Sequence, residues 1–222
     1  MHRDSCVPRF KIEAEHPYQN PNRTSRTMTP PSSAVSLVRD IQSGDPMVAY
    51  EAAKKLPDSR PRPVRELLAI LFTGTAAHSR DAAAYALSWI SSPRHDGVYP
   101  ALLQIAGDRR QPETLRGQAF EGIAYHIASH SPSRRHHLWP HSLEVIRARL
   151  ADASGHVVFW ACFAAGDLCN RELLPALEYL RDNDKRIEPG WWSIADEASD
   201  AISAIHGLLP LHRTRLSTTS EP

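Results

Sequence analysis

The chain has 222 residues, 41% of them hydrophobic and 23% charged, which suits one globular domain or one short repeat array. Its formal net charge is only +1, which argues against recruitment of nucleic acid or a membrane surface by bulk electrostatic attraction. No apolar run is long enough for a transmembrane helix, and residues 1–10 lack the apolar centre of a signal peptide. We therefore expect a cytoplasmic protein that does not associate with membranes.

The three cysteines do not suggest a disulfide framework. Cys162 and Cys169 are seven residues apart on one expected helix, a separation of about 10 Å, which is too far for a bridge between them. We expect reduced cysteines, with Cys162 in the core.

The two ends of the chain differ from its centre. Residues 1–31 hold five prolines, scattered basic residues and no sustained hydrophobic period, so we expect a flexible arm there. Helical periodicity begins after Ser32 and Ser33, which suit helix N-caps, and continues to residue 207. Residues 208–222 are expected to form a flexible tail.

One apolar stripe occurs five times in residues 32–207. Ala83, Ala86, Leu87 and Ile90 fall at i, i+3, i+4 and i+7, the pattern of a helix that packs on one side. Equivalent stripes begin at four other alanines: Ala49, Ala119, Ala161 and Ala198. The five lead alanines are 34, 36, 42 and 37 residues apart, and a helical unit that returns near a fixed period is typical of a helical repeat array.

A second expected helix precedes each of these five. Ser43 and Gly44 end the first helix, and Asp45 then caps the next, with Pro46 at its first position. Further apolar stripes begin at Val64, Val98, Leu143 and Leu173. Ten helices, alternately outer and inner, account for residues 33–206. The sequence therefore predicts an all-α fold.

Residues 115–125, LRGQAFEGIAY, resemble the inner helix of HEAT-like repeats of the type also found in phycobilisome lyases. The expected outer helices are similar too, with a proline in residues 99–102 and 174–177. The resemblance implies a right-handed α-α superhelix, a HEAT-like solenoid of about five helix pairs. His126 departs from the pattern at an aliphatic position, and residues 129–141 lengthen the fourth unit. The same fold serves scaffolds, inhibitors, transport factors and a few enzymes, so the resemblance does not choose a function.

The rows two residues before and after each lead alanine point roughly 160° to 200° away from the core side of the helix. In a HEAT-type superhelix they would line the concave surface. The row after reads Glu51, Tyr85, Glu121, Phe163 and Asp200, and the row before reads Met47, Asp81, Gly117, Phe159 and Asp196. Neither row contains Lys or Arg. The row six residues after the lead alanine adds Lys55, Trp89, Tyr125, Asp167 and Ala204.

Aromatic anchors among acidic side chains suit a groove for a protein partner with a basic patch. The candidate partner-binding residues are Asp81, Tyr85, Trp89, Glu121, Tyr125, Phe159, Phe163, Asp167, Asp196 and Asp200. We expect a non-enzymatic protein–protein interaction module that acts as an adaptor, an inhibitor or an immunity-type binder. The alternative is an ordinary solvated face, with the aromatic residues of the fourth unit packed under its long insertion. Trp191 and Trp192 are either an anchor at one end or a packed loop.

Catalytic and metal chemistry have little support in the sequence. Six histidines fall in or near the third and fourth units: His126, His130, His136, His137, His141 and His156. Two histidines four residues apart on a helix can share a zinc ion, but no HExxH motif or His-Glu pair is present. Motifs for nucleotide, dinucleotide or serine-hydrolase chemistry are also absent. We expect no cofactor, no metal and no enzymatic activity.

Nucleic acid is the main alternative partner. HEAT-like alkylpurine DNA glycosylases combine a basic concave surface with tryptophans and a carboxylate, and this chain offers several tryptophans with Asp167 and Asp196 as acids. A duplex binder neutralises on the order of 6–10 phosphates with Lys and Arg. The rows identified above offer almost none, so a DNA glycosylase or another nucleic-acid-binding protein is the second hypothesis.

Overall fold

The computed structural model describes residues 33–90, 97–130 and 137–208. The first half of this part forms α1 (Ala34–Ile41), α2 (Pro46–Lys55), α3 (Val64–Thr73), α4 (Ala77–Trp89) and α5 (Val98–Gly107). The second half forms α6 (Glu113–His130), α7 (Trp139–Arg149), α8 (Gly155–Leu168), α9 (Leu174–Asn183) and α10 (Ile194–Ile205). These ten helices confirm the predicted all-α class for the described residues. The expected arm of residues 1–31 and all of the expected tail except Leu208 lie outside them.

The first two helices begin where the sequence predicts. The Ser33 hydroxyl oxygen accepts a hydrogen bond from the Ser36 backbone N–H at 3.1 Å. The Asp45 carboxylate accepts from the backbone N–H groups of Met47 and Val48 at the start of α2, with Pro46 as the first helical residue. Side-chain oxygens thus satisfy N–H groups that have no partner inside the helix.

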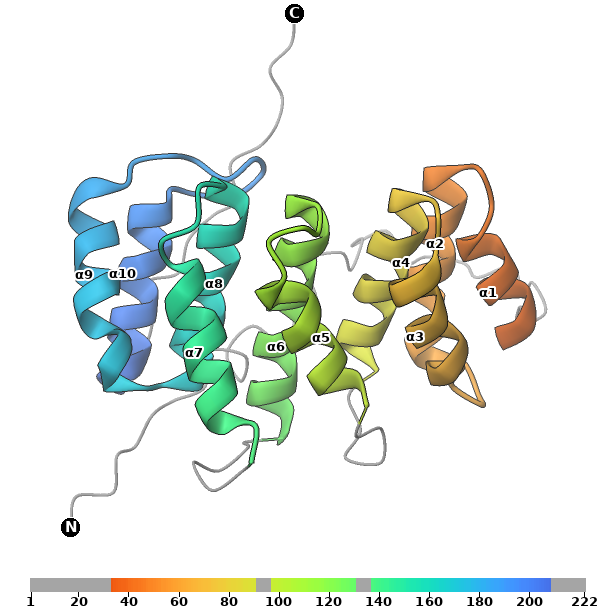
Figure 1. Ribbon diagram of the computed structural model, residues 1–222, viewed down its shortest axis with the longest axis horizontal. Coiled ribbons are helices and arrows are strands. Elements are labelled where there is room, and N and C mark those ends of the chain that lie inside the picture. Colours follow the sequence, from red (N-terminus) through yellow and green to blue (C-terminus); the bar gives the residue numbers. More distant parts are fainter. Residues whose placement is uncertain (1–32, 91–96, 131–136, 209–222) are drawn as a thin grey trace, which may run out of the picture.

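The helices form two sets that alternate along the chain. The even-numbered helices contact one another in the order α2, α4, α6, α8 and α10, and each odd-numbered helix packs on the even-numbered helix that follows it. Figure 1 shows the helices succeeding one another along the long axis of the molecule, from α1 at one end to α9 and α10 at the other. We call α2, α4, α6, α8 and α10 the central row.

Small residues let the helices of the central row approach closely. The five lead alanines of the sequence pattern, Ala49, Ala83, Ala119, Ala161 and Ala198, are all fully buried. Gly122 of α6 lies so close to its neighbours that a Cβ atom there would be 2.4 Å from Ser88 Oγ and 2.9 Å from Leu102 Cδ1. The predicted stripes are therefore the packing surface between neighbouring helices.

The central helix α8 is buried on more sides than the outer helix α9. Every residue of α8 from Val157 to Leu168 is buried, whereas α9 buries only Leu177 and Leu180. A helix that is apolar around its whole circumference belongs in a core, and one with a single apolar stripe belongs at a surface.

Two arginines connect consecutive units in the same way. Arg80, three residues before the lead alanine of α4, donates to the Leu71 carbonyl at 2.8 Å and to Gln111 Oε1 at 2.6 Å. Arg116, in the equivalent position of α6, donates to the Gln111 carbonyl at 3.2 Å and to Asp152 Oδ2 at 2.6 Å. Each arginine thus bonds back to the segment before its helix and forward to the loop that precedes the next helix of the central row.

Asp152 is the charged acceptor in this set. Its side chain is 6% exposed, and it also accepts from Arg149 at 3.1 Å and from the Ser154 backbone N–H at 3.1 Å. Burial opposes its ionisation, but the hydrogen bonds from Arg116, Ser154 and Arg149 together outweigh that effect and lower the pKa of Asp152.

The cysteines follow the sequence analysis in part. Cys162 is a buried thiol in α8, so Cys162 and Cys169 are not bridged to each other, as their spacing predicts. Cys169 is disulfide-bonded, and the expectation of reduced cysteines is wrong for this residue. In the described part of the chain, no helix is both long and apolar enough to cross a membrane.

We expect Asp152→Asn to lower the free energy of unfolding by about 3 kcal/mol at neutral pH, because it removes the anion that two buried arginines share. The lowered folded-state pKa means that the wild type loses this advantage as the pH falls below the ordinary aspartate value of 3.8. Urea unfolding of both proteins at several pH values measures the difference. Asp182→Asn is the control, because the pair of Asp182 with Arg181 is exposed. An equal decrease in the free energy of unfolding in the two variants would contradict the assigned role of Asp152.

Gly122→Ala should destabilise the protein by about 1–3 kcal/mol, because its Cβ has no room between α4, α5 and α6. Gly44→Ala is the matched control, since nothing lies within 4 Å of a Cβ at that position. Thermal unfolding of both variants compares them. A Gly122→Ala variant as stable as the wild type would mean that these helices do not pack as closely as described.

Candidate functional site

A line of aromatic rings crosses the central row. It starts with Tyr50 of α2 and Tyr85 of α4, whose ring centroids are 5.1 Å apart. Trp89 of α4 follows at 6.2 Å from Tyr85, and Trp89 is 4.2 Å from Tyr125 of α6. Tyr125 is 6.2 Å from Phe163 of α8, in an edge-to-face arrangement. These separations are typical of interacting aromatic pairs.

The line continues through α8 to the connection between α9 and α10. Phe163 is 5.6 Å from Trp160, which is 5.3 Å from Trp191. We call the whole set the aromatic row; it consists of Tyr50, Tyr85, Trp89, Tyr125, Phe163, Trp160 and Trp191. One ring-to-ring path therefore links four helices of the central row to residues 184–193.

Residues 184–193 fold against α8 through a tight turn. Gly190, with φ of 77°, occupies a left-handed conformation that suits glycine, and the backbone N–H of Glu188 donates to the Trp192 carbonyl at 3.1 Å. Both Trp191 and Trp192 lie 6.0 Å from the ring of Phe159, and Trp192 Nε1 donates to Glu197 Oε2 at 2.8 Å. The two tryptophans are half-buried and pack against Phe159, as expected for the packed-loop alternative of the sequence analysis.

Three half-buried carboxylates lie on helices α4, α6 and α10 of the central row, and each accepts a hydrogen bond from a neighbouring side chain. Glu121 accepts from Gln118 Nε2 at 2.6 Å and from Tyr125 Oη at 2.9 Å, both on α6. Asp81 of α4 accepts from Thr114 Oγ1 of α6 at 3.2 Å. Asp196 of α10 accepts from the Ser193 hydroxyl. We call Asp81, Glu121 and Asp196 the acidic triplet.

The environment of Asp81 changes its ionisation. Burial raises the pKa of Asp81, although the hydrogen bond from Thr114 and the positive charge of Arg80 oppose the shift. A cationic group placed next to this carboxylate would favour its ionised form, so Asp81 suits contact with a basic partner.

A contact between the half-buried His156 and the buried Glu188 lies beside the aromatic row. His156 Nδ1 lies 2.6 Å from Glu188 Oε1, and the Glu188 side chain is 8% exposed. The rings of His156 and Trp160 are 6.5 Å apart. Gly117 makes room for both, because a Cβ there would lie 2.2 Å from His156 Nε2 and 3.0 Å from Trp160 Cδ1.

The structure corrects the expected exposure of several candidate residues. Asp81, Trp89, Glu121 and Asp196 are half-buried, as a contact surface requires. Six others are at most 8% exposed: Tyr85, Tyr125, Phe159, Phe163, Asp167 and Asp200. The expectation that all ten present open surface is therefore wrong. Phe159 in particular is a core residue, because it is fully buried and both Trp191 and Trp192 lie against its ring.

We call the surface formed by the aromatic row and the acidic triplet the face. Several residues of the face were not among the candidates chosen from the sequence. Tyr50 is one residue after its lead alanine, and Trp160 is one residue before its own, so both fall outside the rows at two and six residues. Gln118 and Thr114 donate hydrogen bonds to Glu121 and Asp81, but neither residue belongs to a recognisable sequence motif. For Trp160, the frequency of aromatic residues in α8 was a signal that the sequence offered.

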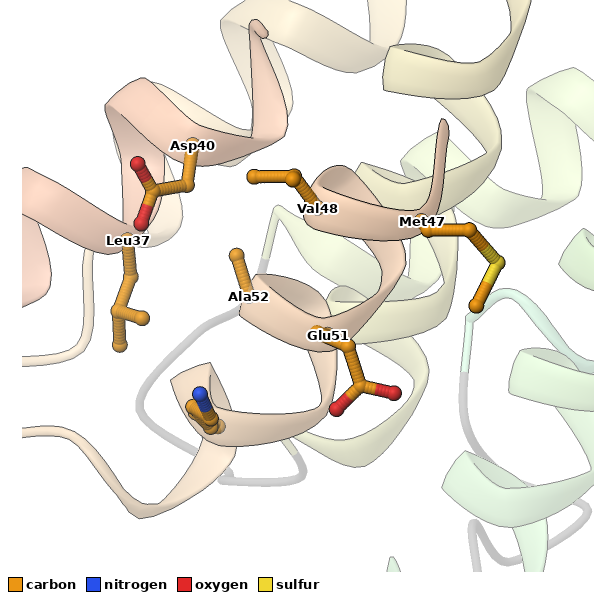
Figure 2. Close-up of a pocket in the computed structure, with 7 residues that line it drawn as sticks. Leu37, Asp40, Met47, Val48, Glu51 and Ala52 are labelled. Carbon is orange, nitrogen blue, oxygen red and sulfur yellow. The ribbon is translucent and has the colours of Figure 1, made fainter. Parts of the chain in front are cut away.

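A small pocket lies at the α1–α2 end of the row. It has a volume of about 270 Å³ and is lined by Leu37, Asp40, Met47, Val48, Glu51, Ala52 and Lys55. Figure 2 shows Val48 and Ala52 of α2 turned toward Asp40 of α1, with Met47 and Glu51 on the other side of α2. Met47 is 67% exposed, and Glu51 pairs with Lys54. This end of the central row therefore combines apolar, acidic and basic side chains.

Of the histidines considered for a metal site, His156 lies beside the aromatic row, and His126 and His141 have other neighbours. His126 Nε2 lies 3.4 Å from the Leu87 carbonyl, and His141 contacts Glu144 at 3.9 Å on the outer helix α7. Among the described residues, no group of three or more His, Cys, Asp and Glu side chains has the geometry to hold a metal ion. His136 and the His130 side chain lie outside the described set.

Comparison with known proteins assigns no family: no protein-family model matches the chain, and no curated protein matches it. A functional argument for this face must therefore be based on the residues of this chain alone.

Trp89 and Tyr125 form the closest ring pair of the aromatic row, so we expect them to stabilise the protein together. A double-mutant cycle with Trp89→Leu and Tyr125→Leu should give a coupling free energy of about 0.5–1.5 kcal/mol. Denaturant unfolding of the four proteins measures it. The same cycle with Tyr179→Leu on α9 in place of Tyr125→Leu should give no coupling, and equal values in both cycles would contradict a direct ring contact.

Proposed function

We propose that the protein is a non-enzymatic interaction module in which the central row of a HEAT-like solenoid binds a protein partner with a basic patch. The supporting observation is the combination of the aromatic row with the acidic triplet on the five helices of the central row. Aromatic rings held by one another offer rigid contact area, and carboxylates held by hydrogen bonds are already oriented before binding. Adaptor, inhibitor and immunity-type roles all use this kind of surface.

The repeat arrangement supports the solenoid part of the proposal. Helix pairs follow one another in chain order, each central helix contacts the next, and Arg80 and Arg116 make equivalent bonds to Gln111 and Asp152 in the following unit. Such an array leaves one side of the central row for binding, because the odd-numbered helices occupy the other.

The charges favour a basic protein over nucleic acid. Asp81, Glu121 and Asp196 would repel phosphates, at about 1 kcal/mol for each close charge pair even in water. The exposed arginines Arg109, Arg147 and Arg171 lie instead in a loop, on the outer helix α7 and at a short turn. A DNA glycosylase on the same scaffold is therefore the second candidate, supported only by its tryptophans and nearby acids. A cytoplasmic location stays a prediction.

Charge reversal on the face tests the proposal. We expect Glu121→Lys/Asp196→Lys to weaken the partner about 30-fold or more, because two oriented charges become repulsive. The wild-type protein is used to capture partners from the source organism, and each identified partner is then purified and titrated by calorimetry. Asp200→Lys is avoided because Asp200 is 2% exposed and the variant would bury a charge.

The matched control is Glu144→Lys/Glu178→Lys, which makes the same charge change on exposed positions of the outer helices α7 and α9. It should bind within about twofold of the wild type. Equal binding by the face variant would refute the proposed site. Binding of duplex DNA by the wild type, strengthened by Glu121→Lys/Asp196→Lys, would support the nucleic-acid candidate instead.

A further inference from the structure

We propose that a second copy of this chain docks on the α1–α2 end of the central row. In the resulting two-fold dimer, the pocket between α1 and α2 of each copy lies against the same pocket of the other; we call this pocket the end groove. The inference does not depend on the proposed function, because no residue of the aromatic row or the acidic triplet lines the groove. Two observations carry it: the apolar surface exposed at this end and the distribution of charge along the groove.

The α1–α2 end is a place where the repeat array has no further neighbour. Helices α4, α6 and α8 each pack on a central helix at both sides, whereas α2 packs on α4 alone within the central row. The uncovered end of a helical repeat array needs a polar outer surface to stay soluble. Yet α2 exposes Met47 at 67% and Val48 at 41%, so this end has the character of a contact surface.

The helix at the opposite end of the central row is different. The positions of α10 that are not buried are mostly polar: Asp196, Ser199, Ile202 and Ser203. A polar stripe of this kind is what a terminal helix exposed to water requires. The apolar surface of α2 is therefore a property of one end and does not follow from the repeat itself.

The end groove is acidic at one end and basic at the other. Residues 42–45 connect α1 to α2, so Asp40 near the end of α1 and Val48 near the start of α2 both lie close to this connection. Lys55 is the last residue of α2, seven residues beyond Val48, which corresponds to about 10 Å along the helix. Between them lie the apolar Leu37 and Ala52, each 3% exposed. Figure 2 shows Val48 and Ala52 turned toward Asp40 across the groove.

The two charged groups at the ends of the groove are available for a partner. Neither the Asp40 carboxylate nor the Lys55 ammonium forms a side-chain hydrogen bond or an ion pair with another residue of the part that the structure describes. The neighbouring Glu51, in contrast, pairs with Lys54. An unpaired acid and an unpaired base thus flank an apolar centre.

This pattern is complementary to itself. A two-fold axis through the middle of the groove reverses the direction of the second copy, so that Asp40 of each copy meets Lys55 of the other. The two Val48 side chains would then enter the facing grooves, whose volume of about 270 Å³ leaves room for them. Opposite charges that meet twice fix the register, and the apolar centre supplies contact area.

Sedimentation velocity of the full-length protein tests the proposal, in buffer without reductant so that the disulfide of Cys169 stays intact. We expect a monomer–dimer equilibrium with a dissociation constant of about 1–50 µM, as suits a small interface. Asp40→Lys and Lys55→Glu should each raise this constant at least tenfold, because each places like charges together at both contacts. Circular dichroism establishes that both variants are folded.

An equimolar mixture of the two single variants is the decisive sample. Each Asp40→Lys copy can pair with a Lys55→Glu copy, and both contacts are then attractive again. The mixture should therefore dimerise within about threefold of the wild-type constant, although neither variant does so alone. Glu178→Lys is the control, because it reverses a charge at an exposed position of α9 and should dimerise like the wild type.

A second pair of variants tests the apolar centre and replaces the charge variants if they do not fold. Val48→Asp puts an acidic residue in the first turn of α2, where the helix dipole favours it, so the variant should fold. It should raise the dissociation constant at least fivefold, because it brings two carboxylates together at the two-fold axis. Tyr179→Asp, at a position of α9 that is 67% exposed, should leave the dimer unchanged.

Three results would overturn the proposal. The first is a wild type that is monomeric at 200 µM. The second is dimerisation of Asp40→Lys, Lys55→Glu or Val48→Asp with the wild-type constant, which would place the contact elsewhere. The third is a series of oligomers that grows with concentration and is abolished by Tyr179→Asp. Such a series would join the end groove to the α9 end of the next copy in an open chain.

Discussion

Close contact between neighbouring central helices is the constraint on which the rest of the structure depends. The lead alanines of all five central helices are fully buried, and Gly122 has no space for a Cβ atom. Helices that approach this closely bring the side chains of successive units within contact distance. The ring contacts between α4, α6 and α8, at 4.2 and 6.2 Å, are a consequence of this spacing. Larger residues at the lead positions would separate both the helices and the rings.

The same spacing explains how a stable core and a candidate binding face share residues. The aromatic row is partly core, since Tyr125 and Phe163 are almost completely buried, and partly surface, since Trp89 is half-buried. Glu121 accepts a hydrogen bond from Tyr125, so its carboxylate is oriented by the aromatic row. Such a surface loses little conformational freedom on binding, which is the physical basis of the proposed interaction role.

The sequence predicted the fold better than the face. Lead alanines at a near-constant period identified the central helices, because a packing stripe depends on local spacing, and Ser33 and Asp45 marked helix starts because capping is also local. The exposure of the face depends on contacts between segments distant in the chain, which periodicity does not encode. Phe159 was expected at the surface and lies in the core under Trp191 and Trp192. Tyr50 and Trp160 were missed because they fall one residue from their lead alanines.

Hydrogen exchange of the full-length protein with and without a purified partner tests the central claim most directly. If the face of the central row is the binding site, added partner will slow exchange in α4, in α6 and in residues 185–196, and leave the outer helices α3, α7 and α9 unchanged. Slower exchange confined to α3, α7 and α9 would place the partner on the opposite side of the molecule and contradict the account.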